Sequence, residues 1–535
     1  MPDTVQHNHI PAQRDVLLGG HAIHGLFHLN LDFGPIEKVE DTLRQHVEQV
    51  TKISADDLPK RLSLSKPQAD LQNARLWEPL NGKGMALDDF YPYARQIMGA
   101  KADEATVCIS LGLGREGKQA LTQLLGGKPR LWRLRLGQAA QNRCRQNAID
   151  LQFDNARLFL FRTGVVILDL SWHYSSRNGT LPADVVLEGN YLLSHGNHPT
   201  KAPAASEDGP APLDPLQLLE VAQALLPQSW AQTAPLQPNR LLLHSVANVA
   251  DGADEEGLLE LGIRLSHRQT RDYRPKSQPL ESHVLQPFPY LCHVLAPEGA
   301  ASVIFTETAK PDANVSNDAE PKAGSVVGGD KAGSRFFENF VSSSGTNTYV
   351  PLFVASLHNH LWLLAQTEWL PARGQGGKRH EIHDLEEVYE RTVEFRRFFY
   401  FPMISQISLH NAFYERSQEV FKIAERQRFL EQTTHDIAEL LKARRTKWIG
   451  RISGAVAGVL VSHELLDIVS QSGLPGTMPN LRVWLADTAH ASPTVIEPMV
   501  RLVERWDLIL FLGSVAGGLV GYWAAWYFDK SPKAE

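Results

Sequence analysis

The spacing of apolar and polar residues divides the chain into two unlike parts, and the change lies near residue 365. In the first part, short runs with a two-residue period alternate with stretches of helical period, which is typical of mixed α/β structure. Residues 26–31, within 15–35, alternate apolar and polar side chains and predict a first strand. Apolar residues at helical spacing then predict a helix over 36–53.

The clearest strand pair is a hairpin over residues 153–174. Two apolar runs flank the residues Arg162-Thr163-Gly164, and a three-residue connection with glycine in the left-handed position suits a β-hairpin. Both strands are apolar enough to be buried in a sheet. Further apolar runs predict more strand segments, at 241–244, 284–295 and 348–353.

These features predict one α/β domain over residues 1–365. Within it, residues 198–213 are rich in Pro, Ala, Ser and acidic side chains, and residues 309–334 are almost free of large apolar ones. Such composition cannot bury enough apolar surface to form structure, so both segments are predicted to be surface or disordered loops.

The second part begins as a long helical pattern, which predicts a helical stalk over 380–447. Glycine is absent from 380–449, and Pro402 is the one proline there, where it should break or kink the helix. Beyond Pro402, seven positions step by three and four residues, which is typical of a coiled-coil seam. They are Val420, Ile423, Gln427, Leu430, Thr434, Ile437 and Leu441.

The most apolar stretch of the chain lies near its end, over residues 506–528. Residues 508–527 carry no charge over 20 positions, which matches the length that a helix needs to cross a bilayer. Aromatic residues stand at both ends, as in membrane anchors. Three glycines four residues apart predict a smooth face for helix packing: Gly513, Gly517 and Gly521.

A second, weaker membrane segment is predicted over 448–469. Only residues 452–462 are free of charge, but small residues repeat every four positions along it. Polar groups inside a membrane span usually face a bundle interior or a watery cavity. The small and polar residues of this segment are therefore predicted to line a pore: Gly450, Gly454, Gly458, Ser462, His463 and Glu464.

The charge distribution predicts how such segments would be oriented. Basic residues at 442–451 outnumber those at 470–505, which places the stalk on the cytoplasmic side and 470–505 outside, as a loop with an amphipathic helix. The predicted fold class is thus an α/β cytosolic domain followed by a long α-helical stalk and two C-terminal transmembrane helices. The predicted location is the inner (plasma) membrane of a cell.

One glycine motif in the first part has the spacing of a phosphate-binding turn. Gly112, Gly114 and Gly117 follow a predicted strand and precede a helical pattern, the context in which backbone N–H groups hold a phosphate. No acidic residue occurs over 118–149, so the ribose-binding carboxylate of a dinucleotide site is missing. Arginines follow instead, at Arg130, Arg133 and Arg135. An anionic or nucleotide ligand, nicotinamide binding and a plain glycine-rich turn all remain open.

Composition narrows the remaining chemistry. The formal charge of −7 argues against general binding of nucleic acid. Cys108, Cys144 and Cys292 are far apart and are predicted to be reduced, buried thiols. His21, His24 and His28 lie close together in the first strand, where a structural role is favoured over metal binding. No catalytic residues are predicted, because no Ser/His/Asp or paired-carboxylate arrangement can be identified from spacing.

The order of parts, including Phe398-Phe399-Tyr400-Phe401 and the helical run to Leu441, resembles the CorA-like divalent cation channels. The resemblance implies a pentamer whose first membrane helix lines the pore, and Mg²⁺ or another divalent cation as cargo. The Gly-Met-Asn signature of that family is absent, and the nearest residues are Gly476-Thr477-Met478-Pro479-Asn480. Divergent CorA-like proteins also occur as membrane effectors of bacterial defence, some of them associated with type III CRISPR loci, in which a nucleotide signal acts on the cytosolic domain.

The sequence therefore predicts an oligomeric channel or transporter for divalent cations, gated by its cytosolic domain, and not an enzyme. Two alternatives remain. One is a membrane effector gated by a nucleotide or another small anionic ligand. The other is a membrane-anchored nucleotide-binding enzyme that uses residues 112–117.

Overall fold

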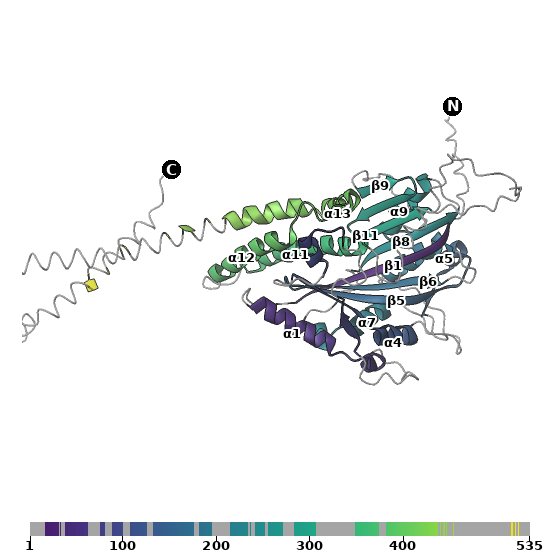
Figure 1. The fold of residues 1–535 in the computed structure, drawn as a ribbon, viewed down its shortest axis with the longest axis horizontal. Coiled ribbons are helices and arrows are strands. Elements are labelled where there is room, and N and C mark those ends of the chain that lie inside the picture. Colours follow the sequence, from purple (N-terminus) through teal and green to yellow (C-terminus); the bar gives the residue numbers. More distant parts are fainter. Residues whose placement is uncertain are drawn as a thin grey trace, which may run out of the picture. The chain divides into compact units, whose positions relative to one another are not determined.

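A computed structural model describes the chain from residue 16 to residue 436 with gaps, and only isolated positions beyond it. The largest gaps are 62–74, 195–214, 271–282 and 306–347. The chain divides into two compact units, Met1–Glu431 and Gln432–Glu535. Almost all described residues belong to the first unit, which is shown in Figure 1.

A single mixed sheet of eleven strands organises the described part of the first unit. Neighbouring strands follow the order β2-β3-β5-β6-β1-β8-β11-β10-β9, with β4 beside β5 and β7 beside β1. Strand β1, drawn purple in Figure 1, lies between β6 and β8. Among the described strands, only β8 and β11 pair in parallel. The strands are β1 (Leu17–Asn30), β2 (Trp77–Pro79), β3 (Cys108–Leu113), β4 (Trp132–Arg135), β5 (Ala148–Phe161), β6 (Val165–Ser175), β7 (Leu181–Pro182), β8 (Leu242–Asp251), β9 (Val284–Phe288), β10 (Leu291–Ala296) and β11 (Gly299–Phe305).

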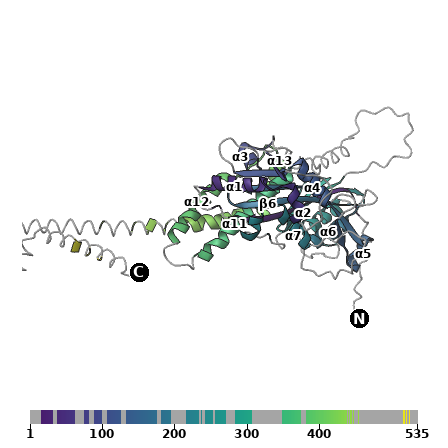
Figure 2. The same ribbon diagram turned by 90° about the horizontal axis from the view of Figure 1, so that it is seen from below.

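Helices cover both faces of this sheet. The described helices are α1 (Val39–Thr51), α2 (Leu58–Arg61), α3 (Pro92–Ile97), α4 (Arg115–Leu125), α5 (Gln138–Cys144), α6 (Ala183–Ser194), α7 (Pro215–Ala224), α8 (Gln228–Thr233), α9 (Glu255–Ser266), α11 (Tyr349–Arg373), α12 (Glu381–Phe399) and α13 (Ser408–Val420), with a short 3₁₀ turn at Ala55–Asp57. One apolar core joins α1, α4, α6, α7 and α9 to the first face. A second core joins α3, α11, α12 and α13 to the other face (Figures 1 and 2).

Strands β5 and β6 form an antiparallel hairpin, and β6 also pairs with β1. This hairpin confirms the one predicted over 153–174. Its turn depends on Gly164, which has φ +87°. The Gly164 carbonyl accepts a hydrogen bond of 2.8 Å from the N–H of Leu31, and a Cβ at this glycine would lie 2.2 Å from the Leu31 carbonyl oxygen. The turn therefore needs both the left-handed backbone and the missing side chain of glycine.

The predicted stalk is not one long helix that leads away from the α/β domain. Helix α12 ends at Phe399, which confirms the break expected at Pro402, and it buries Phe395 and Phe399 in the second core. Helix α13 packs against α11 and the strands β9 and β10. These helices form part of the layer that covers the sheet, because their apolar faces are buried against the apolar face of the sheet.

The predicted coiled-coil seam is buried within the first unit up to Leu430. Val420, Ile423 and Leu430 belong to the second core, and Gln427 is also buried. Lys422 interrupts the helical run with φ 53°, so the seam does not lie on one continuous helix. A three-and-four spacing of apolar residues is therefore explained by packing against the sheet layer as well as by a coiled coil.

The two predicted transmembrane helices are also wrong. No helix among the described residues is long and apolar enough to cross a membrane. The structure therefore does not support the prediction of a multi-pass protein of the inner membrane. It does not support the description of the protein as a channel either. The segments on which it depended, 448–469 and 506–528, lie outside the described residues apart from single positions.

One predicted strand is a helix. Residues 348–353 read as strand, but they begin α11, whose first half is buried on all sides. A short apolar run that is buried all round has no visible period, so strand and helix cannot be distinguished from it.

Candidate functional site

A row of polar side chains crosses the sheet on the face covered by α11 and α13. Side chains alternate between the two faces of a strand, and the strand registers place these residues side by side. Arg157 pairs with Asp169, His24 with His244, and His293 with Ser302. This polar row runs from β5 to β10 and consists of Arg157, Asp169, His24, His244, Ser302 and His293.

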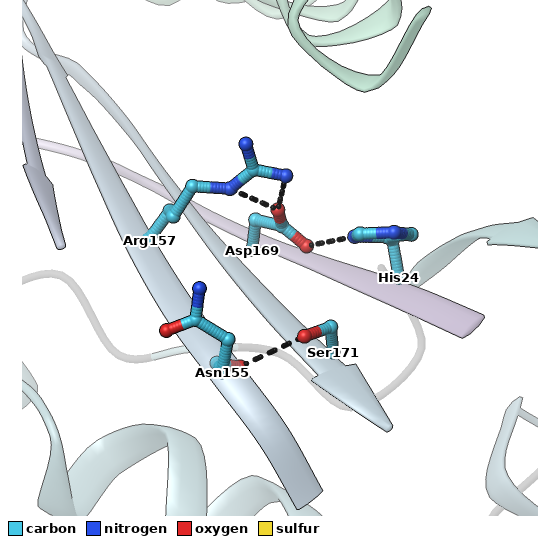
Figure 3. Close-up of polar contacts among 5 residues, drawn as sticks. All are labelled: His24, Asn155, Arg157, Asp169 and Ser171. Carbon is cyan, nitrogen blue, oxygen red and sulfur yellow. Dashed lines mark hydrogen bonds and ion pairs between the residues drawn. The ribbon is translucent and has the colours of Figure 1, made fainter. Parts of the chain in front are cut away.

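Three members of the row form an ion-pair centre, drawn in Figure 3. Arg157 donates from Nε and Nη2 to Oδ2 of Asp169, each at 3.1 Å. His24 Nδ1 lies 2.9 Å from Oδ1 of the same carboxyl group. Asp169 is 1% exposed and Arg157 6% exposed, so a full charge pair lies inside the protein.

Asp169 is the acceptor for both neighbours. Burial alone would raise the pKa of its carboxyl group, but the charges of His24 and Arg157, and the hydrogen bonds from both, lower that pKa overall. Asp169 is therefore a carboxylate at neutral pH. It fixes the guanidinium of Arg157 in one orientation and accepts a hydrogen bond from Nδ1 of His24.

The far end of the row consists of neutral groups. Oγ of Ser302 lies 3.2 Å from Nε2 of His244 and 2.9 Å from Nδ1 of His293. Burial lowers the pKa of His244 well below its usual value, and it lowers the pKa of His293 to about 3. The rings of His24 and His244 are 6.3 Å apart between centroids. Charge in the row is thus concentrated at its Arg157 end.

Several buried polar atoms near this centre have no hydrogen-bond partner among the described residues. They include Nη1 of Arg157, Oδ1 of Asn155 and Nδ1 of His244. Figure 3 shows one guanidinium nitrogen of Arg157 directed away from Asp169, with the amide of Asn155 on the same strand. Buried polar groups nearly always have a partner in protein or solvent, so each of these atoms is a candidate for a bond to water or to a ligand.

The same strands carry a second polar pair further from the centre. His173 Nδ1 lies 2.8 Å from Oδ1 and 2.9 Å from Oδ2 of Asp154, and these side chains are 33% and 26% exposed. A β-bulge between Phe153 and Asn155 leaves Asp154 as the extra residue. The hydrogen bond to Asp154 raises the pKa of His173, against burial, and the carboxylate charge adds to this rise.

The predicted glycine motif lies elsewhere, at the β2 side of the sheet. The strand-turn-helix context of residues 112–117 is present, as β3 followed by α4. However, the segment around β2 occupies the space that these glycines leave. A Cβ at Gly114 would lie 2.6 Å from Glu78, and one at Gly117 would lie 2.4 Å from the Leu76 carbonyl, which also accepts the Gly114 N–H at 3.2 Å.

The two predicted arginines that the structure describes do not lie beside these glycines. Arg133 and Arg135 lie on β4, where Arg133 pairs with Asp150, whereas Gly112 pairs with Arg157. Seven residues of β5 separate the two pairings, which is roughly 20 Å along a strand. Other predicted site residues lie outside the described residues: Arg130, Gly450, Gly454, Gly458, Ser462, His463, Glu464, Gly513, Gly517 and Gly521.

An open cavity of about 570 Å³ lies between α1 and the β2 edge of the sheet. Arg44, Arg75, Glu48 and Glu78 are among its lining residues. Its charges balance, and Glu48 is already paired with Lys52 at 2.7 Å. The cavity therefore shows no preference for one kind of ligand.

No group of His, Cys, Asp and Glu residues able to hold a metal ion occurs in the described part of the chain. The divalent cation implied by the resemblance stays a prediction. The three cysteines are free and buried, which confirms the reduced thiols expected from their spacing.

Comparison with protein-family models, with curated proteins and with solved structures finds no match to this chain. The resemblance to CorA-like channels likewise stays a prediction. The function must therefore be inferred from the geometry of the chain itself.

The ion-pair centre was only partly visible in the sequence. His24 was singled out, but Arg157 and Asp169 were hidden inside the apolar runs of the predicted hairpin. The available signal was the presence of a charge in each of two strands that were apolar enough to be buried, since such charges must be paired or hydrogen-bonded.

Proposed function

We propose that the α/β unit binds a small anionic ligand at the ion-pair centre of Arg157, Asp169 and His24. The observation that supports this proposal is the unpartnered Nη1 of Arg157, inside a buried ion pair. Nucleotides were among the ligands expected from the sequence, and an acidic group is the part of such a ligand that this centre would recognise.

The guanidinium of Arg157 is suited to this role. Its Nε and Nη2 donate to Asp169, which leaves the Nη1 edge for another acceptor. Arginine presents its donors in a planar fork that matches carboxylate and phosphate oxygens. Asp169 holds this fork still, so little side-chain entropy is lost when an anion binds.

The neighbouring groups narrow the ligand further. Oδ1 of Asn155 is an acceptor without a partner among the described residues. A ligand with a hydroxyl or amino group next to its acidic group would therefore satisfy both Arg157 and Asn155. An acid without such a donor would leave Oδ1 of Asn155 without a hydrogen bond, and this would lower the affinity for the ligand.

Access to the centre depends on motion. Nη1 of Arg157 is enclosed, and the layer of α11 and α13 lies on this face of the sheet. A ligand can reach the atom only when the side chains above it move aside. Binding should therefore be slower than encounter by diffusion.

Isothermal titration of the full chain in a phosphate-free buffer tests the proposal. Inorganic phosphate and nucleoside monophosphates are the probes, and the variant is Arg157→Lys, which keeps the charge but loses the fork. The matched control is Arg416→Lys, on an exposed ion pair with Glu419. We expect saturable binding to the wild type and to the control, and at least tenfold weaker binding to Arg157→Lys. Absence of binding to the wild type, or equal affinity in the Arg157 variant, would contradict the proposal.

A further inference from the structure

The strands β5 and β6 carry a continuous line of polar side chains away from the ion-pair centre. All lie on the same face of the sheet or, for Asp154, at the bulge that turns toward it. Ser171 donates a hydrogen bond of 3.2 Å to the Asn155 carbonyl, between the two ends. We call this line the polar track; it consists of Arg157, Asp169, Asn155, Ser171, Asp154 and His173.

The polar track has two distinct ends. Asp169 and His173 are four residues apart on β6, which corresponds to about 13 Å. The ion-pair centre at one end is buried, whereas the His173–Asp154 pair at the other end is about one-third and one-quarter exposed. A ligand would enter at His173 and place its acidic group at Arg157.

Both ends offer charged recognition groups. Asp154 is hydrogen-bonded to Nδ1 of His173, so Nε2 is the ring nitrogen that remains for a contact with a ligand. Asn155 supplies an acceptor without a partner in the described residues between the ends. Such an alternation of cation, acceptor and imidazole suits a ligand with several polar groups along its length.

From this geometry we infer that the ligand is an elongated molecule of nucleotide size, with its acidic group at Arg157 and its other end at His173 and Asp154. The inference rests on the proposed function, because it assumes that an anion binds at Arg157. Inorganic phosphate fills only one end of a track of about 13 Å. A nucleoside monophosphate is long enough to contact both ends.

Titration calorimetry on the full chain separates the two ends. The probes are inorganic phosphate and the monophosphates of adenosine, guanosine, cytidine and uridine. The variants are His173→Gln and Arg157→Lys, with His435→Gln as a control on an exposed histidine. At least one nucleotide should bind tenfold or more tightly than phosphate. His173→Gln should weaken that nucleotide about tenfold and leave phosphate unchanged, whereas Arg157→Lys should weaken both.

The outcomes are distinguishable from failure of the proposed function. If phosphate binding depends on Arg157 but no nucleotide exceeds phosphate, or if His173→Gln leaves nucleotide affinity unchanged, the inference is overturned and the proposed function stands. If neither phosphate nor any nucleotide binds the wild type, both fall. Should His173→Gln fail to fold, Asp154→Asn removes the charge that holds the His173 ring and should weaken the nucleotide in the same direction.

Discussion

Asp169 is the residue that connects the charged side chains of the polar row. One buried carboxylate accepts hydrogen bonds from Arg157 and His24, which come from the strands on either side of it. A buried charge pair contributes little net stability when intact, because desolvation offsets the attraction. Removing one partner is costly, since the other charge then stays buried without compensation.

We expect Asp169→Ala to lower the free energy of unfolding by about 3–5 kcal/mol, because it leaves the Arg157 guanidinium unpaired inside the sheet layer. Urea denaturation at neutral pH measures this change. The control Glu419→Ala breaks an exposed pair with Arg416 on α13 and should cost less than about 1 kcal/mol. A loss for Asp169→Ala as small as that of the control would show that Arg157 is not buried as described.

Among the elements, the β5–β6 hairpin positions the site. It brings Arg157 and Asp169 into register as cross-strand neighbours and continues to His173 and Asp154. The turn at Gly164 is fixed against β1 through Leu31. A distortion of this turn should therefore change the alignment of β5 and β6 at the ion-pair centre, although the turn lies at the opposite end of the hairpin from His173.

We expect Gly164→Ala to destabilise the protein by at least about 2 kcal/mol, because alanine at positive φ is strained and its Cβ would overlap the Leu31 carbonyl oxygen. Gly137→Ala is the matched control: Gly137 has φ −67°, and no atom lies within 4 Å of the added Cβ. Its cost should stay below about 1 kcal/mol. Thermal and urea unfolding of the two variants compare them. Equal stability of both would contradict the role given to Gly164.

The hairpin also shows what the sequence could predict. Apolar runs on both sides of Arg162-Thr163-Gly164 were enough, because hairpin strands pair locally and the turn has its own chemistry. The helical period over 36–53 likewise gave α1. Residues 348–353 and the predicted stalk failed for one reason. Their apolar positions are satisfied by packing on the sheet, and a sequence pattern does not show what an apolar face packs against.

The site could not be predicted for a different reason. His24 and Asp169 are 145 residues apart, and they meet only because β1 inserts between β6 and β8. Strand order is a non-local property that single-residue patterns do not contain. The glycines of 112–117 misled in the opposite way. Their spacing is that of a phosphate site, but their small size allows the close approach of residues 76–80.

At the scale of the first unit, an eleven-stranded sheet lies between two helical layers, and histidines are buried at several separate points of it. His244 and His293 lie in the sheet, and His358 lies in α11, where it is hydrogen-bonded to Thr163 at 2.8 Å. Burial lowers the pKa of His293 and of His358 to about 3, and that of His244 well below its usual value. These rings are neutral in the folded protein.

This burial predicts acid-sensitive stability. Below about pH 6.5 the unfolded chain binds protons that the folded state excludes, so stability is complete above that pH and falls as the pH decreases. Each histidine should cost about 1.4 kcal/mol at pH 5.5 relative to pH 7.5, or about 4 kcal/mol for the three together. His173 opposes this slightly, because its raised pKa favours the folded state in the same window.

Urea denaturation at pH 7.5 and pH 5.5 measures the effect. Asp169 does not contribute in this window, since its lowered pKa affects stability only under more acidic conditions. His293→Gln should reduce the difference between the two pH values by about 1.4 kcal/mol, the share of one buried histidine. A free energy of unfolding that is equal at both pH values would contradict the neutral, buried state of these histidines.

The central claim is that an anion belongs at the unpartnered edge of Arg157. A crystal structure of the full chain grown with a nucleoside monophosphate, in a buffer without phosphate or sulfate, tests it most directly. We expect the phosphate oxygens within hydrogen-bond distance of Nη1 of Arg157, with the nucleoside lying along β5 and β6 toward His173. An ordered water in contact with Nη1, with the nucleotide absent or bound elsewhere, would contradict the claim.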